Sequence, residues 1–190
     1  LAHTFQHLPD KAAAAAKAFA CLKPGGFVVI KTVDDSLKAS WPDPDGIMRQ
    51  VMAFYEDRVR ATKPHTRHTD RNNGAKCYGL LCDAGFEGVS IDVRHATTAG
   101  LGRDERLAFF ERMTYFRKPS PEDAEAVQRM GELLAQWREL FLQDGYFFDS
   151  PTFMVVGRKP GAAGTSGDAS CALRDEALVE RDGFTLAPMT

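Results

Sequence analysis

The sequence lacks the long apolar runs, the leader and the paired cysteines that mark several classes of protein. No apolar run approaches the roughly 20 residues that a transmembrane helix needs, and no basic, apolar leader is visible, so we expect no signal peptide. The sequence has four cysteines, Cys21, Cys77, Cys82 and Cys171. No two of them have the CxxC spacing that is typical of zinc and redox sites. We therefore expect reduced thiols, a cytoplasmic protein, and neither a metal centre nor a membrane partner.

The sequence also lacks a strong charge of either sign. It has 24 Lys and Arg residues against 26 Asp and Glu, a formal net charge of -2, and the basic residues are scattered. Proteins that bind nucleic acids usually concentrate basic residues on one face, so we expect no nucleic-acid partner. A length of 190 residues with 44% hydrophobic and 26% charged residues suits one globular domain with a real core.

The chain does contain a helix followed at once by a strand. Residues 10–22, DKAAAAAKAFACL, predict a helix because alanine has the highest helix propensity, and Pro9 and Asp10 suit its first turn. Residues 24–26, Pro-Gly-Gly, end the helix and permit a tight reversal. The β-branched run FVVIKTV, 27–33, then predicts a strand that is buried on both faces. This unit is typical of an α/β fold.

Further elements follow from periodicity. Apolar residues at three- and four-residue steps predict amphipathic helices over 47–60, 103–117 and, after an N-cap at Ser120, 121–142. We also predict a loop over 34–46, a helix over 75–85, and strands over 86–96 and 152–159. The small and polar stretch GAAGTSGDAS predicts a linker, so we place the domain at 1–160 and a flexible linker and tail at 161–190.

Three short stretches, taken in order, resemble one family. HTFQHLPD (3–10), LKPGGFVVI (22–30) and LLCDAGFEGVSI (80–91) resemble the C-terminal part of a class I S-adenosylmethionine-dependent methyltransferase. The resemblance implies an α/β fold with a Rossmann-like doubly wound sheet, of which this chain would supply strands 4 to 7. TFMVVGRK (152–159) would be the antiparallel seventh strand. It also implies S-adenosyl-L-methionine as cofactor and methyl transfer as the activity. Because no basic groove marks a nucleic acid, we expect a small-molecule acceptor.

The resemblance also implies that part of the enzyme is not in this chain. In this family the first strand supplies a glycine-rich loop for the cofactor, whereas residues 1–20 contain no glycine. We therefore expect the chain to be a fragment without the N-terminal cofactor-binding half. Such a fragment would bind the cofactor weakly and be inactive alone.

Residues 97–150 depart from the family, because they place helices between the last two strands where a short hairpin is usual. This insertion could close the substrate pocket or form a homodimer. An alternative function remains open, namely a non-catalytic methyltransferase-like module that binds a protein partner through the inserted helices.

Candidate site residues lie first at the N-terminus. The resemblance implies that Ala2 and His3 line the methionine side of the cofactor, with Thr4 and His7 beside it. Two local alternatives remain: His3 and His7 could bind a metal, although no third ligand is evident, and Gln6 with His7 could cap the alanine-rich helix.

A second group of candidates follows the strand at 27–33. Asp34 and Asp35, with Trp41 and Asp43, could form an acidic and aromatic rim suited to a cationic amine, although aspartates in such loops also form turns and helix caps. Candidate general bases for the acceptor are His3, His7 and Asp35.

Polar residues before the helix at 75–85 form a third group. Arg71, with Gly74, could orient an anionic substrate group through its planar guanidinium, or could face solvent. His65, His68 and Asp70 form a weak metal motif, for which a polar loop is the simpler interpretation.

Overall fold

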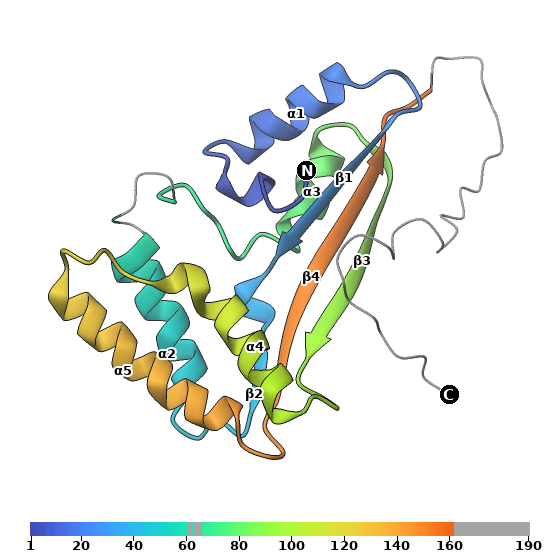
Figure 1. Ribbon diagram of the computed structural model, residues 1–190. Helices are drawn as coiled ribbons and strands as arrows, with labels where there is room; N and C mark the ends of the chain where they lie inside the picture. The colour runs from blue at the N-terminus through green and yellow to red at the C-terminus, as the bar shows by residue number, and fades with distance from the viewer. Residues whose placement is uncertain (61, 63–65, 162–190) are drawn as a thin grey trace. The chain divides into compact units, whose positions relative to one another are not determined.

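An open antiparallel sheet of four strands, β1 (Phe27–Val33), β2 (Ala39–Trp41), β3 (Glu87–Thr97) and β4 (Phe147–Arg158), organises the chain (Figure 1). The structure is a computed structural model that describes residues 1–60, 62 and 66–161. Strand β4 pairs with β1 and, at its beginning, with β2, and its opposite edge pairs with β3. Because β1 and β3 are both antiparallel to β4, they run in the same direction. The predicted α/β class is confirmed, as an open sheet with helices. That the strands correspond to strands 4 to 7 of a Rossmann-like sheet stays a prediction.

Five α-helices of the described residues surround the sheet: α1 (Lys11–Cys21), α2 (Ile47–Phe54), α3 (Lys76–Asp83), α4 (Arg103–Thr114) and α5 (Ala124–Phe141). Four shorter helical segments extend or join them: η1 (Phe5–His7), η2 (Asp35–Leu37), the π-helical η3 (Tyr55–Arg60) and η4 (Tyr115–Arg117). None of the helices in the described ranges combines the length and apolarity that crossing a bilayer requires.

Helix α1 and the turn after it match the prediction closely. The Asp10 side chain accepts a hydrogen bond from the Ala13 N–H at 2.8 Å and caps the helix, so Gln6 and His7 are not its cap. Gly25 has a φ of 79°, in the left-handed region that glycine adopts without a steric penalty. The Pro-Gly-Gly turn is therefore a structural bend between helix and strand.

The prediction that β1 is buried on both faces is wrong. Val28, Ile30 and Thr32 are buried, whereas Phe27 and Val29 on the other face are 50% and 42% exposed. Helices α1 and α3 pack against the first face only, forming a core whose buried members are Phe5, Ala15, Val28, Ile30, Cys77, Leu81, Phe86, Phe153 and Val155. A continuous apolar run does not by itself distinguish one covered face from two.

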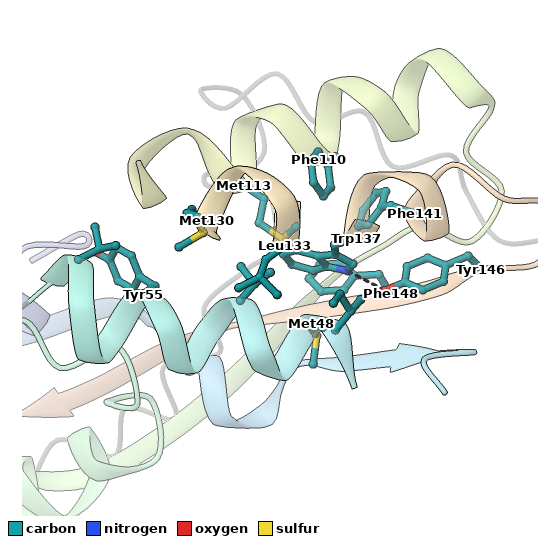
Figure 2. Packing of buried hydrophobic residues seen from close by; sticks show 13 residues of the cluster. Met48, Tyr55, Phe110, Met113, Met130, Leu133, Trp137, Phe141, Tyr146 and Phe148 are labelled. Carbon is teal, nitrogen blue, oxygen red and sulfur yellow. Dashed lines mark hydrogen bonds between the residues drawn. The ribbon is translucent and has the colours of Figure 1, made fainter. Parts of the chain in front are cut away.

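A second core lies between the helices at the other end of β4 (Figure 2). Successive side chains of a strand point to opposite faces, so Phe148 and Phe153, five residues apart on β4, face opposite sides of the sheet. Phe148 packs into the core formed by α2, η3, α4 and α5, whose buried residues include Phe110, Trp137 and Phe141. The segment 97–150 is thus a packed helical layer that shares its core with α2.

Several predicted boundaries and faces differ in detail. The predicted loop 34–46 contains η2 and the short strand β2, whose pairing with β4 is a long-range contact without a local signal. Helix α5 begins at Ala124, capped by Asp123 rather than Ser120, because the Asp123 carboxylate accepts from the Ala126 N–H at 3.0 Å. Val127, predicted to face the core, is 43% exposed.

Candidate functional site

Three segments that are far apart in the sequence meet at the carboxyl end of β1. The His3 N–H donates to the Lys31 carbonyl at 2.7 Å, so the first residues run parallel to β1. The Asp35 N–H donates to the Arg71 carbonyl at 2.8 Å, and the Asp70 N–H donates to the Gln6 carbonyl at 2.9 Å. Ligands of open α/β sheets commonly bind outside the carboxyl ends of strands, so this junction is a candidate ligand site.

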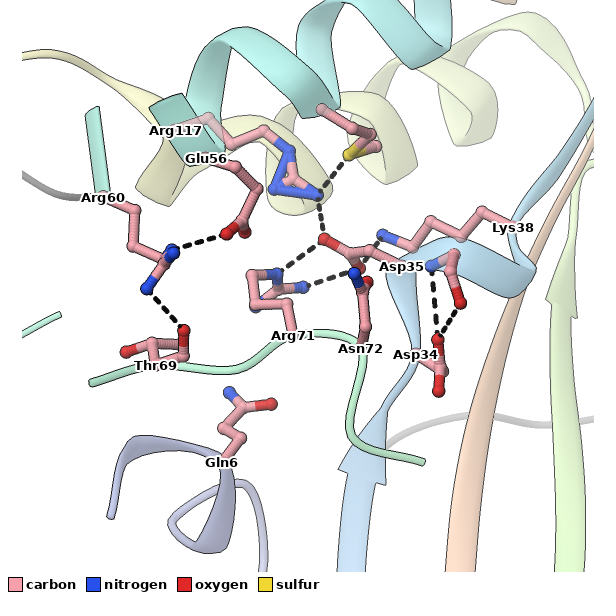
Figure 3. Close-up of polar contacts among 12 residues, drawn as sticks. Gln6, Asp34, Asp35, Lys38, Glu56, Arg60, Thr69, Arg71, Asn72 and Arg117 are labelled. Atoms are coloured by element: carbon pink, nitrogen blue, oxygen red, sulfur yellow. Dashed lines mark hydrogen bonds and ion pairs between the residues drawn. The ribbon is translucent and has the colours of Figure 1, made fainter. Parts of the chain in front are cut away.

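A buried ion cluster centred on Asp35 occupies this junction (Figure 3). The Arg71 guanidinium binds the Asp35 carboxylate with both of its arms, from Nε to Oδ2 at 2.7 Å and from Nη2 to Oδ1 at 3.1 Å. Arg117 Nη2 donates to Oδ2 at 3.0 Å, and Lys38 Nζ lies 2.9 Å from Oδ1. One carboxylate therefore holds three cations, which come from the residue after η2, from the segment before α3 and from η4.

Burial and mutual charge shift the pKa values of this cluster. Burial alone would raise the pKa of Asp35, but Lys38, Arg117 and Arg71 outweigh it and hold that pKa well below its usual range. Burial lowers the pKa of Lys38 to about 8 although Asp35 opposes the change, and burial lowers the pKa of Arg117 to about 10. Asp35 thus stays ionised at neutral pH, and a carboxylate with so low a pKa is a weak base. Its three cationic neighbours favour the role of counter-ion over the predicted role of general base.

The pKa of Lys38 predicts an unusual dependence of stability on pH. Since this pKa is about 8 in the folded chain and about 10.5 when unfolded, the unfolded state binds the extra proton between these pH values, and the free energy of unfolding rises there. We expect the rise in the free energy of unfolding that Lys38 causes to reach about 2 to 3 kcal/mol near pH 10. Urea titrations of the wild type and of Lys38→Met, compared pH by pH, measure it.

The comparison with Lys38→Met is needed because other buried groups act in the opposite sense. Burial raises the pKa of Cys77 to about 11 and raises that of Tyr55 and Tyr146, which lowers stability in alkali. The wild type and the Lys38→Met variant share these groups, so the difference between their free energies of unfolding reports on Lys38 alone. A difference that stays flat from pH 7 to pH 10 would contradict the shifted pKa.

A cavity of about 270 Å³ opens beside the cluster. Its lining combines the apolar side chains of one side of α2 with charged and amide groups, and the lining residues are Asp35, Ser36, Lys38, Met48, Arg49, Met52, Ala53, Glu56 and Asn72. Burial raises the pKa of Glu56, which forms an ion pair with Arg60. Glu56 therefore has a higher proton affinity than Asp35 within this cavity. Nothing in the sequence distinguishes Glu56 from an ordinary polar residue of an amphipathic helix, so it was not predicted as a site residue.

Arg117 is the second residue of the site that was not predicted from the sequence. Its side chain is fully buried, with the guanidinium carbon 5.2 Å from the centre of the Tyr55 ring and Nη2 2.9 Å from Met52 Sδ. It lies 82 residues from Asp35 in the sequence, at the end of the predicted helix 103–117, where an arginine usually faces solvent. The inserted segment 97–150 thus contributes directly to this site.

The predicted cofactor residues lie together at the start of the chain. Ala2, His3 and Thr4 are exposed, His3 adopts a left-handed φ of 52°, and the Thr4 hydroxyl donates to the Ala2 carbonyl at 3.1 Å. His7 Nδ1 lies 2.7 Å from the Thr69 hydroxyl, which fixes the imidazole against the segment before α3. Among the described residues, no group of three or more His, Cys, Asp and Glu side chains is placed to hold a metal ion.

The aspartates of the predicted acidic rim serve local structure. Asp34 is buried and accepts hydrogen bonds from Ser36 and from the Ala75 N–H. Asp43 accepts from the first backbone N–H groups of α2. Trp41 is 74% exposed and does not line the cavity. The structure therefore does not assemble the rim for a cationic amine, because the carboxylates already have donors.

The remaining candidates are placed as follows. Asp70 pairs with Lys76 at 2.8 Å, and His68 Nε2 accepts from Arg67 Nε, while His65 lies outside the described residues. A Cβ atom at Gly74 would clash with the Phe153 ring, so close packing requires glycine there. Of this group, only Arg71 joins the candidate site.

Comparisons with known proteins give limited similarity. No protein-family model and no curated protein match the chain. A solved structure from Bacillus halodurans C-125, described as a candidate methyltransferase, is 18% identical, with a TM-score of 0.47, over 83% of this chain and 67% of that one.

Two structures of Haemonchus contortus phosphoethanolamine N-methyltransferase 2 are 15% and 16% identical to the chain, each with a TM-score of 0.39. One is bound to phosphomonomethylethanolamine and S-adenosylhomocysteine, and the other to S-adenosyl-L-methionine. Each covers 83% of this chain, which spans only 32% of theirs. At these values the comparisons assign the chain to no family.

Proposed function

We propose that the chain takes part in S-adenosylmethionine-dependent methyl transfer to a small molecule. The observation that carries the proposal is the junction at the carboxyl end of β1, where residues 1–7, 34–38 and 69–72 meet beside a cavity. This is the edge of the sheet at which the resemblance of HTFQHLPD and LKPGGFVVI implies that cofactor and acceptor meet.

The first residues suit one end of the cofactor. Ala2, His3 and Thr4 are exposed, and their backbone is fixed by hydrogen bonds to β1 and by the left-handed turn at His3. Such a surface fits the methionine part of S-adenosylmethionine, which supplies an electrophilic methyl group when bound. The described residues would hold only this part of the cofactor. We propose that a glycine-rich loop upstream would hold the remainder of the S-adenosylmethionine molecule.

The cavity beside Asp35 would hold the acceptor. Methyl transfer is an in-line displacement, so most of the acceleration comes from holding the acceptor atom in line with the methyl group. The apolar wall formed by Met48, Met52 and Ala53 and the polar wall around Lys38 and Asn72 would fix its orientation. The layer formed by residues 97–150 would exclude water, since Arg117 reaches the cluster from it.

A steric variant tests the cofactor site. In the natural protein that contains this sequence, Ala2→Phe is expected to raise the Kd for S-adenosylmethionine by about tenfold or more, because a bulky ring would occupy the surface proposed for the methionine part. Calorimetric titration measures the Kd, and transfer of a radiolabelled methyl group to small-molecule extracts measures the activity.

Ala12→Phe is the matched control, because Ala12 is exposed on α1 and should bind the cofactor like the wild type. Equal affinity in both variants would place the cofactor elsewhere. A natural protein that binds no S-adenosylmethionine would exclude the proposal and favour the alternative of a non-catalytic module.

A further inference from the structure

We propose that the outer edge of β3 is an interface at which two copies of this chain pair, strand against strand and antiparallel, about a two-fold axis at Val93. Strand β3 is an outer strand of the sheet, and among the described residues it pairs only with β4 (Figure 1). Residues 90–97 pair with β4 in regular register. Such an edge presents a row of backbone N–H and C=O groups, to which a strand of another chain can bind.

The backbone of every second residue of β3, including Val93, points away from β4. Lys31 on β1 forms its backbone hydrogen bonds with residues 1–3, so it forms none with its partner on β4, Met154. In an antiparallel ladder a residue exchanges both hydrogen bonds with its partner or neither, so Met154 bonds to Asp92 on β3 instead. Val93, the next residue after Asp92, therefore offers its N–H and C=O groups to a new strand.

Charge selects the register of this pairing. With the two-fold axis at Val93, Asp92 lies directly opposite Arg94 of the second copy, and Arg94 lies opposite Asp92 of the second copy. An axis one residue away would place Asp92 opposite Asp92 or Arg94 opposite Arg94, and like charges directly opposite each other are destabilising. Asp92 and Arg94 are 55% and 64% exposed and contact each other at 2.7 Å. The two copies would therefore form one cluster of alternating charges.

The other face of β3 is also complementary to itself. Val93 is partly buried against the core beneath α1 and α3, whereas Ile91 is 39% exposed. In the proposed register Val93 lies beside Val93 of the second copy, and Ile91 lies beside His95 of the second copy. Cross-strand pairs of this kind stabilise a sheet through their contact. The pairing would therefore cover Ile91, which is the most exposed large apolar side chain of β3, and join two sheets into one.

Charge reversal tests both the interface and its register. Sedimentation equilibrium of the full 190-residue chain should show a dimer that dissociates on dilution. Asp92→Arg and Arg94→Asp should each raise the dissociation constant of this dimer by about tenfold or more, because like charges then lie opposite each other. An equimolar mixture of the two variants should dimerise like the wild type, since every charge at the interface then faces its opposite. Both positions are exposed, so both variants should fold.

Glu122→Arg reverses an exposed charge before α5 and is the matched control, which should dimerise like the wild type. Amide hydrogen exchange gives a second readout, because the Val93 N–H should exchange more slowly as the concentration of the chain rises. A wild type that remains monomeric would overturn the inference, whether the edge of β3 is bare or covered by another part of the chain. A dimer that neither reversal weakens would also overturn it, and would favour the predicted contact through the inserted helices.

Discussion

Asp35→Asn is expected to lower the free energy of unfolding by about 3 to 5 kcal/mol, because it leaves two buried cations and the partly buried Arg71 without their shared counter-charge. The carboxylate binds Arg71 through two hydrogen bonds and Arg117 and Lys38 through one contact each. Asparagine has nearly the same shape but no charge, and its amide group would point a donor at these cations. Since a domain of this size is stable by only about 5 to 15 kcal/mol, urea denaturation should show the loss clearly.

Two further variants make this result specific. Asp45→Asn removes an exposed carboxylate and should change stability by less than about 0.5 kcal/mol. The double variant Asp35→Asn with Lys38→Met also removes one of the stranded cations, so it should recover part of the loss. A single variant as stable as the wild type would mean that the cluster is solvated and not a buried ion pair.

Trp137→Ala is expected to lower the free energy of unfolding by about 3 to 5 kcal/mol through the cavity that it creates. Trp137 is fully buried, with ring centres 5.4 Å from Phe110 and 5.8 Å from Phe148 in edge-to-face contact. Its indole N–H donates to the Tyr146 hydroxyl at 2.8 Å, and this hydroxyl would lose its donor (Figure 2). The loss is measured by urea denaturation, as for Asp35.

The position of Trp137 also links stability to the site. The same core holds α2, which forms one wall of the cavity, and Tyr55, which contacts Arg117. The Trp137 variant should therefore also disturb the packing of this wall and of Arg117. Val127→Ala, on the exposed side of the same helix, should change neither property by much. Equal losses from both substitutions would show that burial in the aromatic core does not set the stability of this layer.

Local chemistry by itself determined much of the secondary structure. The alanine run with Asp10 at its start, the glycines of the turn and the β-branched run in 27–33 each act within a few residues, so helix α1, its turn and strand β1 could be predicted, although not that β1 is covered on one face only. The same is true of the amphipathic helices, whose apolar spacing depends on no distant partner. Asp35 and Arg71 could be named as candidates because each occupies a suggestive place beside a predicted element.

Tertiary structure decided how these residues combine. Asp35 was predicted to attract a cation and Arg71 an anion, but the fold pairs them with each other and adds Arg117 from 82 residues away. A contact at such a distance leaves no periodicity or spacing in the sequence, and the sign of a site depends on the sum of charges that the fold assembles. The sequence therefore determined the elements and their order, whereas the packing of β4 and of the helical layer decided which charges meet around Asp35.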